Sequence, residues 1–205
     1  MKVKILKKEG MEISFSVEGI SPGFANALRR IMIGEVPTMA IEWVDFKKND
    51  SVLPDEILAN RLGQIPLTFD KRAYNLPSEC KCGGKGCSEC QVELVLKEKG
   101  PKIVYAGDLK SKAKDVRPVF EKIPVVELFE DEGLEFEAIA QLGLGKEHAK
   151  WQAAVVGYNY EGEKFVFNVE SVSGLNPEEI VLSAAEILEK KMKEFQKSLS
   201  KLKKD

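Results

Sequence analysis

The stretch SPGFANALRRIMIGEVPTMAIEWVDFKKNDSVLPDEILANRLG, residues 21–63, decides the fold of this chain. It predicts a helix, a strand and a second short helix, with Ser21 as the cap of the first helix and Gly34 as its end. The apolar residues of the first helix fall within one arc of about 160° on a helical wheel. These residues are Phe24, Ala25, Ala27, Leu28, Ile31 and Met32. Ile33 lies alone on the opposite face, which indicates that the helix packs on two sides.

Alternating apolar and polar residues predict strands on either side of this stretch. We expect an N-terminal hairpin over residues 3–17 with one buried face, and a strand at 39–46. The second helix of the opening stretch is placed at Asp55–Leu62. Further strands are predicted at 92–97, 103–105, 125–129, 134–142, 153–160 and 164–170. The last two of these are joined by a hairpin turn at Glu161–Glu163.

A long helix is predicted from Pro177 onward, with Asn176 as its cap. Its apolar residues recur at alternating spacings of four and three, as in the a/d seam of a coiled coil. The seam consists of Val181, Ala185, Leu188, Met192, Phe195, Leu199 and Leu202. Further apolar residues widen the first half, which we expect to pack on its own domain. Beyond Glu189 only a narrow seam flanked by lysines remains. Either a partner helix covers that seam or the end of the helix is a frayed, solvated tail.

The opening stretch carries a specific resemblance to a known family. Fourteen of its residues carry the resemblance, about ten of them at fixed positions of a family signature: Asn26-Ala27-Leu28-Arg29-Arg30, Ala40, Val44, Asn49, Ser51, Asp55-Glu56 and Arg61-Leu62-Gly63. This pattern resembles the family of the archaeal RNA polymerase D subunit, the eukaryotic 30–40 kDa polymerase subunits and the bacterial alpha subunit. One position departs from the pattern, because the family usually has His where this chain has Asn60. Asn can form hydrogen bonds but does not titrate near neutral pH.

The resemblance implies an α+β fold with two domains. A dimerisation domain of antiparallel sheet plus two helices is built from both chain ends, residues 1–44 and 152–205. A mostly-β domain is inserted at residues 45–151 and carries a four-cysteine loop at 80–90. Many archaeal relatives also have a ferredoxin-like, cysteine-bearing segment between the last two strands. Only the short Glu161–Glu163 turn occupies that place here.

The resemblance also implies a function, that of a non-catalytic assembly subunit of DNA-directed RNA polymerase. Such a subunit pairs with the small L subunit, forms a platform for the large catalytic subunits and has the N subunit nearby. The residues expected at partner interfaces are Phe24, Leu28, Arg29, Arg30, Ile31, Leu188, Met192, Phe195 and Leu199. The alternatives are a free-standing zinc-loop nucleic-acid-binding protein and a hydrolase or transferase in its own right.

All four cysteines lie within eleven residues, at Cys80, Cys82, Cys87 and Cys90. Four thiolates can close a tetrahedral Zn²⁺ site, and the glycines between them permit tight turns. The Cys87-x-x-Cys90 spacing is usual for zinc, whereas Cys80-x-Cys82 is less usual. Disulfides, an iron–sulfur cluster and free thiols are the alternatives. A zinc ion with four protein ligands is structural, because no coordination position stays open for catalysis.

The remaining residues indicate no catalytic or cofactor-binding site. His148 is the only histidine and has no nucleophile placed beside it, and no closely spaced Asp triad could hold catalytic magnesium. Gly143-Leu144-Gly145-Lys146 only weakly resembles a phosphate-binding loop, because an upstream glycine is missing and Glu147 replaces the required Ser or Thr.

The charge balance bears on possible partners. Lys and Arg together number 31 and Asp and Glu 33, for a net charge of −2, which gives no support for tight DNA binding by this chain. The sequence opens with no apolar run of signal-peptide length, and no stretch reaches 18 apolar residues. We therefore expect a cytoplasmic protein that does not bind membranes.

Overall fold

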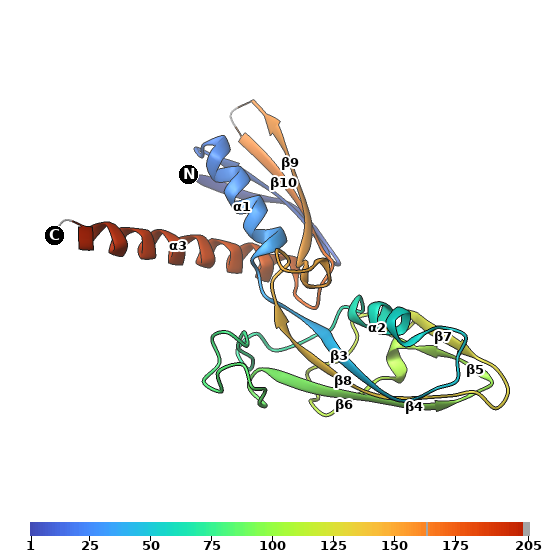
Figure 1. Cartoon of the computed structure of the whole chain (residues 1–205). Coiled ribbons are helices and arrows are strands. Elements are labelled where there is room, and N and C mark those ends of the chain that lie inside the picture. The colour runs from blue at the N-terminus through green and yellow to red at the C-terminus, as the bar shows by residue number, and fades with distance from the viewer. Residues whose placement is uncertain (163, 203–205) are drawn as a thin grey trace. The chain divides into compact units, whose positions relative to one another are not determined.

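The computed structural model describes residues 1–162 and 164–202 and confirms the predicted α+β fold (Figure 1). Residue contacts divide the chain into two compact units. Unit 1 contains Met1–Val36, Leu144–Glu147 and a final segment that starts at Gln152. Unit 2 contains Pro37–Gly143 and His148–Trp151. The chain therefore passes from unit 1 to unit 2 between residues 36 and 37. We expected this boundary between residues 44 and 45. The boundary lies earlier in the chain because the whole strand that follows it pairs within unit 2.

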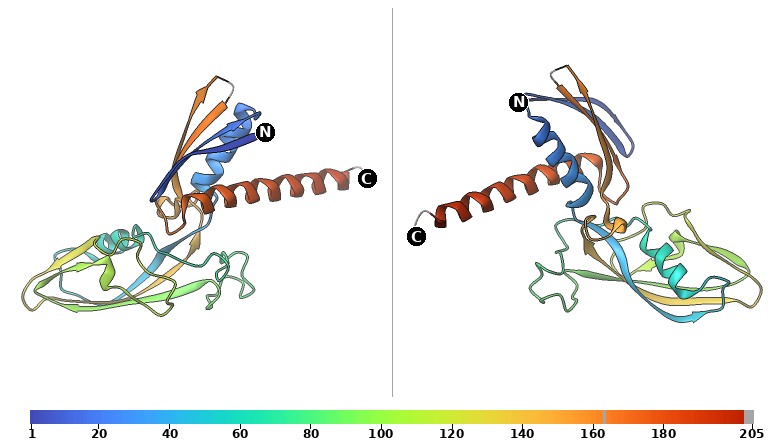
Figure 2. Two further views of the ribbon diagram at one scale, coloured as in Figure 1. Left: turned by 180° about the vertical axis from the view of Figure 1, so that it is seen from behind. Right: turned by 45° about the horizontal axis from the view of Figure 1, so that its top comes forward.

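Unit 1 contains a four-stranded antiparallel sheet in the order β1–β2–β10–β9. Its strands are β1 (Lys2–Glu9), β2 (Glu12–Glu18), β9 (Ala154–Glu161) and β10 (Lys164–Ser171). Its helices are α1 (Pro22–Gly34) and α3 (Pro177–Leu202), which contact each other. Helix α1 lies along one face of the sheet, against β9, while α3 contacts β2 and β10 (Figure 2). Both chain ends thus build one layer of helices on one sheet.

The core of unit 1 follows the predicted periodicity. Phe15 of β2 lies opposite Phe167 of β10, and their rings stack with centroids 5.1 Å apart. On α1, the Ser21 hydroxyl accepts a hydrogen bond from the N–H of Phe24 at 3.2 Å, which confirms the predicted cap. The buried residues of α1 are Ala25, Leu28, Ile31 and Met32. Four of the six residues of the predicted apolar arc therefore face the core of their own unit, whereas Phe24 is exposed and Ala27 is half-buried.

Strand β1 differs from the prediction of a hairpin with one buried face. Every residue of β1 is exposed, whereas Ile13, Phe15, Ser16 and Val17 of β2 are buried. Val3 and Ile5 pair with Val17 and Phe15, so their side chains lie on the apolar face of the sheet. The two side chains are nonetheless each 60% exposed, because β1 is the edge strand and the described helices leave it uncovered.

Unit 2 contains a second sheet in the order β3–β8–β4–β6 and a two-stranded ribbon of β5 and β7. These strands are β3 (Thr38–Asn49), β4 (Gln91–Lys99), β5 (Lys102–Tyr105), β6 (Lys110–Ser111), β7 (Pro124–Leu128) and β8 (Gly133–Gly143). Helix α2 (Asp55–Gly63) contacts β3 and β7 and buries Leu58 and Leu62. The core cluster of this unit also includes Phe136 and Leu94.

Several residues of the family signature hold the turn between β3 and α2. The side-chain amide of Asn49 donates hydrogen bonds to the Leu53 carbonyl at 2.9 Å and to the Asp55 carboxylate at 2.7 Å. The hydroxyl of Ser51 donates to Asn49 Oδ1 at 2.7 Å. Arg61 reaches across to the carbonyl of Pro124 at 2.8 Å. These polar residues therefore have a structural role within unit 2.

Close packing accounts for the two glycines of the weak phosphate-binding motif. An added Cβ at Gly143 would lie 2.3 Å from the ring of Trp151, and one at Gly145 would lie 2.6 Å from the carbonyl oxygen of Ile33. The N–H of Lys146 donates to the Gly34 carbonyl at 2.9 Å, which holds this loop against the end of α1. Both glycines are therefore required by close contacts with neighbouring protein atoms.

Two expectations extend beyond the described residues. The predicted turn at Glu161–Glu163 includes Glu163, which lies outside them, and so does the side chain of Leu202 at the end of the seam. Among the described helices, none is both long enough and apolar enough to cross a membrane.

Candidate functional site

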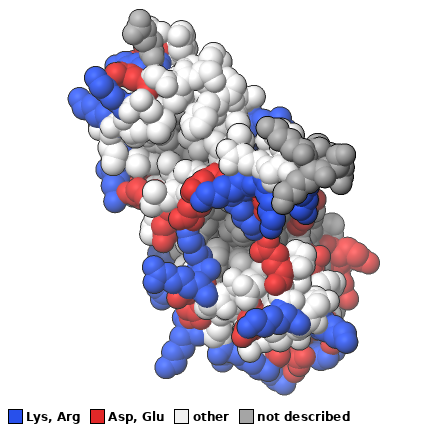
Figure 3. Space-filling model, turned by 90° about the vertical axis from the view of Figure 1, so that its left-hand side faces the viewer, with Lys and Arg blue, Asp and Glu red and all other residues white. Residues whose placement is uncertain are grey.

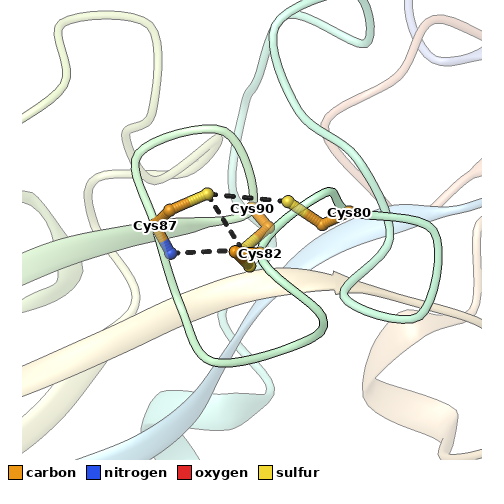
Figure 4. Close-up of side chains that lie close together, drawn as sticks. All are labelled: Cys80, Cys82, Cys87 and Cys90. Atoms are coloured by element: carbon orange, nitrogen blue, oxygen red, sulfur yellow. Dashed lines mark hydrogen bonds between the residues drawn. The ribbon is translucent and has the colours of Figure 1, made fainter.

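The four cysteines meet in the loop between α2 and β4, with their side chains directed toward one another (Figure 4). Cys80 and Cys90 are buried, while Cys82 and Cys87 are half-buried. Gly83, Gly84 and Gly86 have φ values of 66°, 79° and 92°, a backbone region that side chains with a Cβ rarely occupy. These glycines allow the loop to fold back so that residues from its two halves share one site.

The spacing of the sulfur atoms fits a tetrahedral metal ion. The four Sγ atoms all lie within 4.8 Å of one another, and three of the pairs are 3.5, 3.6 and 3.7 Å apart. Thiolates bound to zinc at about 2.3 Å at the corners of a tetrahedron lie about 3.8 Å from one another. A disulfide needs about 2.05 Å, and all four cysteines are free. The donor set and its spacing therefore suit a bound metal better than two disulfides.

Hydrogen bonds and burial give the thiols different acidities. A hydrogen bond from Cys80, helped by the backbone N–H groups of Gly86 and Gly84, lowers the pKa of Cys82 to about 6. Burial raises the pKa of Cys90 to about 12, although its sulfur accepts a hydrogen bond from the N–H of Cys87 at 3.3 Å. A metal ion that binds all four sulfurs as thiolates therefore has to displace protons.

A second candidate site is the C-terminal half of α3, which extends beyond the sheet of unit 1 (Figure 1). In the first half, Ile180 and Ala184 are fully buried against unit 1, as predicted. Residues 189–201 are all exposed. The exposed fractions of Met192, Phe195 and Leu199 are 53%, 58% and 45%. The narrow seam predicted from the sequence is thus a row of apolar side chains that no described part of this chain buries.

The other expected interface residues fall into two groups. Leu28 and Ile31 are buried in the core of unit 1 and offer little surface to another chain. Phe24 and Arg30 are exposed, while Arg29 and Leu188 are half-buried. Arg29 donates a hydrogen bond from Nη2 to Asn26 Oδ1 at 3.0 Å. The burial of Leu28 and Ile31 narrows the candidate surface of α1 to the residues around Phe24.

Sequence reasoning missed the exposed apolar pair on β1. Val3 and Ile5 continue the helix-covered face of the sheet onto its edge strand, where none of the helices in the described part of the chain covers them. Their alternation with lysines was the available signal, since lysines are common on strands at a sheet edge. These two residues join the seam of α3 as candidate contacts with another chain.

Charged side chains of both signs occur together on one face of the molecule. Lys and Arg are interspersed with Asp and Glu on the face shown in Figure 3. Ion pairs between them include Lys97 with Glu135 at 2.8 Å and Lys112 with Glu93 at 2.7 Å on the sheet of unit 2. A mixed surface of this kind gives little attraction for the phosphate backbone of a nucleic acid.

Comparison with known proteins gives a consistent result. Residues 14–192 match the family described as the RNA polymerase Rpb3/Rpb11 dimerisation domain. Three similar proteins are each named DNA-directed RNA polymerase subunit Rpo3. The relative from Methanosphaera stadtmanae is 48% identical over 181 residues, which cover 85% of this chain and 66% of the relative. The relative from Pyrococcus horikoshii is 48% identical over 160 residues, which cover 78% of this chain and 60% of the relative.

The relative from Archaeoglobus fulgidus is 44% identical over 155 residues, which cover 76% of this chain and 59% of that protein. The chain therefore spans roughly three fifths to two thirds of the length of these relatives.

Proposed function

This chain belongs to the RNA polymerase Rpb3/Rpb11 dimerisation domain family, and we propose that it is a non-catalytic assembly subunit of DNA-directed RNA polymerase. It is the equivalent of the archaeal D subunit. Its role is to pair with one small subunit and to present a platform on which the large catalytic subunits assemble. The match over residues 14–192 and the Rpo3 names of its relatives support this proposal.

The observation that carries the proposal is the uncovered seam of α3. Single exposed apolar side chains are normal on a protein surface, but Met192, Phe195 and Leu199 recur at coiled-coil spacing on an exposed helix. An isolated helix of this kind has little to stabilise it, since helices in proteins depend on packing of an apolar face. The partner is the L subunit, which presents a helix of its own to this seam.

The same partner covers the apolar edge of the sheet. Val3 and Ile5 lie on the face of the sheet that already carries α1 and the start of α3. A partner helix that crosses α3 can extend over this face, so that the two chains share one hydrophobic core. Phe24 adds an exposed aromatic residue to the same unit. Leu28 and Ile31 support this interface from within the core of unit 1.

The four-cysteine loop holds one structural Zn²⁺ with Cys80, Cys82, Cys87 and Cys90 as ligands. The sulfur spacing and the all-thiolate donor set support zinc, which is bound in this way in many structural sites. Bound zinc supplies stability to a loop whose three glycines at positive φ lose much conformational freedom on folding. Zinc has no part in chemistry here, because four protein ligands fill its coordination sphere.

Contacts with the large subunits and the N subunit are assigned to the rest of the surface, with the half-buried Arg29 and the exposed Arg30 as candidates on α1. The chain acts in the cytoplasm, has no catalytic residues of its own and does not bind DNA tightly. A free-standing nucleic-acid-binding protein is the second candidate function, and the mixed surface charge counts against it. Purification of the chain from its native cells separates the two functions. We expect it to elute in a large multisubunit complex, and elution as a single chain would contradict the proposal.

A further inference from the structure

The loop that carries the four cysteines joins the sheet of unit 2 at Gln91, the first residue of β4. Gln91 lies opposite Gln141 of β8 in the register of the sheet. The Nε2 of Gln91 donates a hydrogen bond to Oε1 of Gln141 at 3.2 Å. Gln141 is only 9% exposed and Gln91 is half-buried, so the acceptor of this hydrogen bond is largely shielded from water. The base of the loop therefore contains a polar contact between two neighbouring strands.

The side chain of Gln91 also contacts the loop itself. An added Cβ at Gly86 would lie 2.2 Å from Oε1 of Gln91, so the amide of Gln91 packs directly against the backbone of this glycine. The backbone N–H of Gly86 in turn contributes to the low pKa of Cys82. The N–H of Gln91 donates to the carbonyl of Cys87 at 2.9 Å. Gln91 thus contacts Gln141 of β8 on one side and the backbone of Gly86 and Cys87 in the cysteine loop on the other.

Building on the zinc centre proposed above, we propose that Gln91 and Gln141 are positioning residues that hold the loop in its metal-binding conformation before the ion arrives. A loop with glycines at three positions has many conformations to lose when it binds an ion. Contacts that restrict the loop beforehand reduce that loss and so increase the affinity for the metal. Neither glutamine is a ligand, and both act on Cys82 and Cys87 through the backbone of Gly86 and Gln91.

The test measures zinc affinity on the full chain. Gln141→Leu removes the acceptor for Gln91 but keeps a side chain of similar volume. We expect its dissociation constant for Zn²⁺, measured by competition with a chromophoric chelator, to rise about tenfold. This is the smallest loss of metal affinity that is typical when a residue that supports the metal ligands is mutated. Gln141→Glu keeps an acceptor and should stay close to wild type. Gln64→Ala is the matched control, because it removes an exposed amide elsewhere in unit 2.

A second measurement separates positioning from a general loss of stability. Amide hydrogen exchange of the metal-free chain should be faster at residues 83–87 in Gln141→Leu than in wild type, and unchanged in α2. An unchanged zinc affinity in Gln141→Leu, or equally faster exchange throughout unit 2, would overturn this inference and leave the zinc centre standing. A wild-type chain that binds no zinc would instead overturn the zinc centre itself.

Discussion

The ammonium nitrogen of Lys191 on α3 lies 2.5 Å from the carboxylate of Glu35, the residue that caps the end of α1. This ion pair divides α3 into two parts with different environments. Before Lys191 the helix buries Ile180 and Ala184 against its own unit. From Met192 to Lys201 every residue is exposed. The ion pair therefore lies between the part of α3 that packs on its own unit and the exposed part that can contact another chain.

The two parts of α3 should respond differently to mutation. Ile180→Ala opens a cavity in the core of unit 1 and should reduce the free energy of unfolding by about 2–5 kcal/mol. Lys191→Ala removes a partly exposed ion pair and should reduce it by only about 0.5 kcal/mol. Denaturant titration of each variant measures both values. A larger effect for Lys191→Ala than for Ile180→Ala would show that the apolar contacts do not anchor the helix.

Removal of zinc should loosen the cysteine loop and leave unit 1 folded. We expect one zinc per chain by elemental analysis. After chelation, faster hydrogen exchange should be confined to residues 78–91 and their immediate neighbours. Two intact disulfides in protein prepared under reducing conditions, detected by mass spectrometry, would contradict the zinc assignment.

Zinc binding should also depend on pH. The ligands bind as thiolates, so protons compete with the ion more strongly as the pH falls. In the metal-free site the pKa of Cys82 is lowered to about 6 by its hydrogen bonds and that of Cys90 is raised to about 12 by burial. Binding must therefore displace the proton of Cys90 throughout this pH range, and acidification below about pH 6 adds a proton to Cys82 as well. Zinc affinity should therefore decrease from pH 8 to pH 5, as measured with a chelator whose own pH dependence is calibrated. An affinity that does not change over this range would argue against thiolate ligands.

A side chain added at Gly145, in the loop after β8, should destabilise the fold. Gly145→Ala places a Cβ against the carbonyl oxygen of Ile33, a backbone atom that cannot move aside without shifting α1. We expect a loss of about 1–3 kcal/mol in the free energy of unfolding. Gly157→Ala is the control, because an added Cβ there meets open space, and it should be neutral or slightly stabilising. Equal effects of the two substitutions would contradict the packing explanation for Gly145.

The isolated chain should not bind duplex DNA tightly at physiological salt. Its net charge is −2 and its acidic and basic side chains are interspersed, so few phosphates can be neutralised at once. A gel-shift titration should show no complex at nanomolar concentrations. Tight binding that weakens steeply with added salt would instead support the free-standing nucleic-acid-binding protein.

Local sequence patterns were sufficient to predict most of the elements. The cap at Ser21 and the apolar arc of α1 depend only on nearby residues, and both are present in the structure. The four cysteines were predicted to cluster because their spacing in the sequence is short. The contact of Gly145 with Ile33 could not be predicted, since it depends on where a distant loop meets α1.

Periodicity also could not say which chain an apolar residue faces. Leu28 and Phe195 both lie in regular apolar patterns, yet Leu28 is buried in this chain and Phe195 is exposed. Val3 and Ile5 alternate as a buried strand would, but their burial depends on how far the helices extend across the sheet. The tertiary structure is needed to distinguish a core residue from an interface residue. A hydrophobic pattern predicts that a residue is buried, but it does not identify the chain that buries it.

Co-purification with the small L subunit tests the central claim most directly. The variant carries the substitutions Phe195→Asp and Leu199→Asp. Both side chains are exposed in this chain, so the circular dichroism spectrum of the variant should match that of the wild type. A central aromatic residue at an interface contributes on the order of 2–4 kcal/mol, so the double variant should fail to retain the small subunit. Lys197→Asp alters the net charge by the same amount on the opposite face of α3 and should pair normally. If the double variant pairs as well as the wild type, the seam of α3 is not the partner surface and the proposed assembly role loses its structural basis.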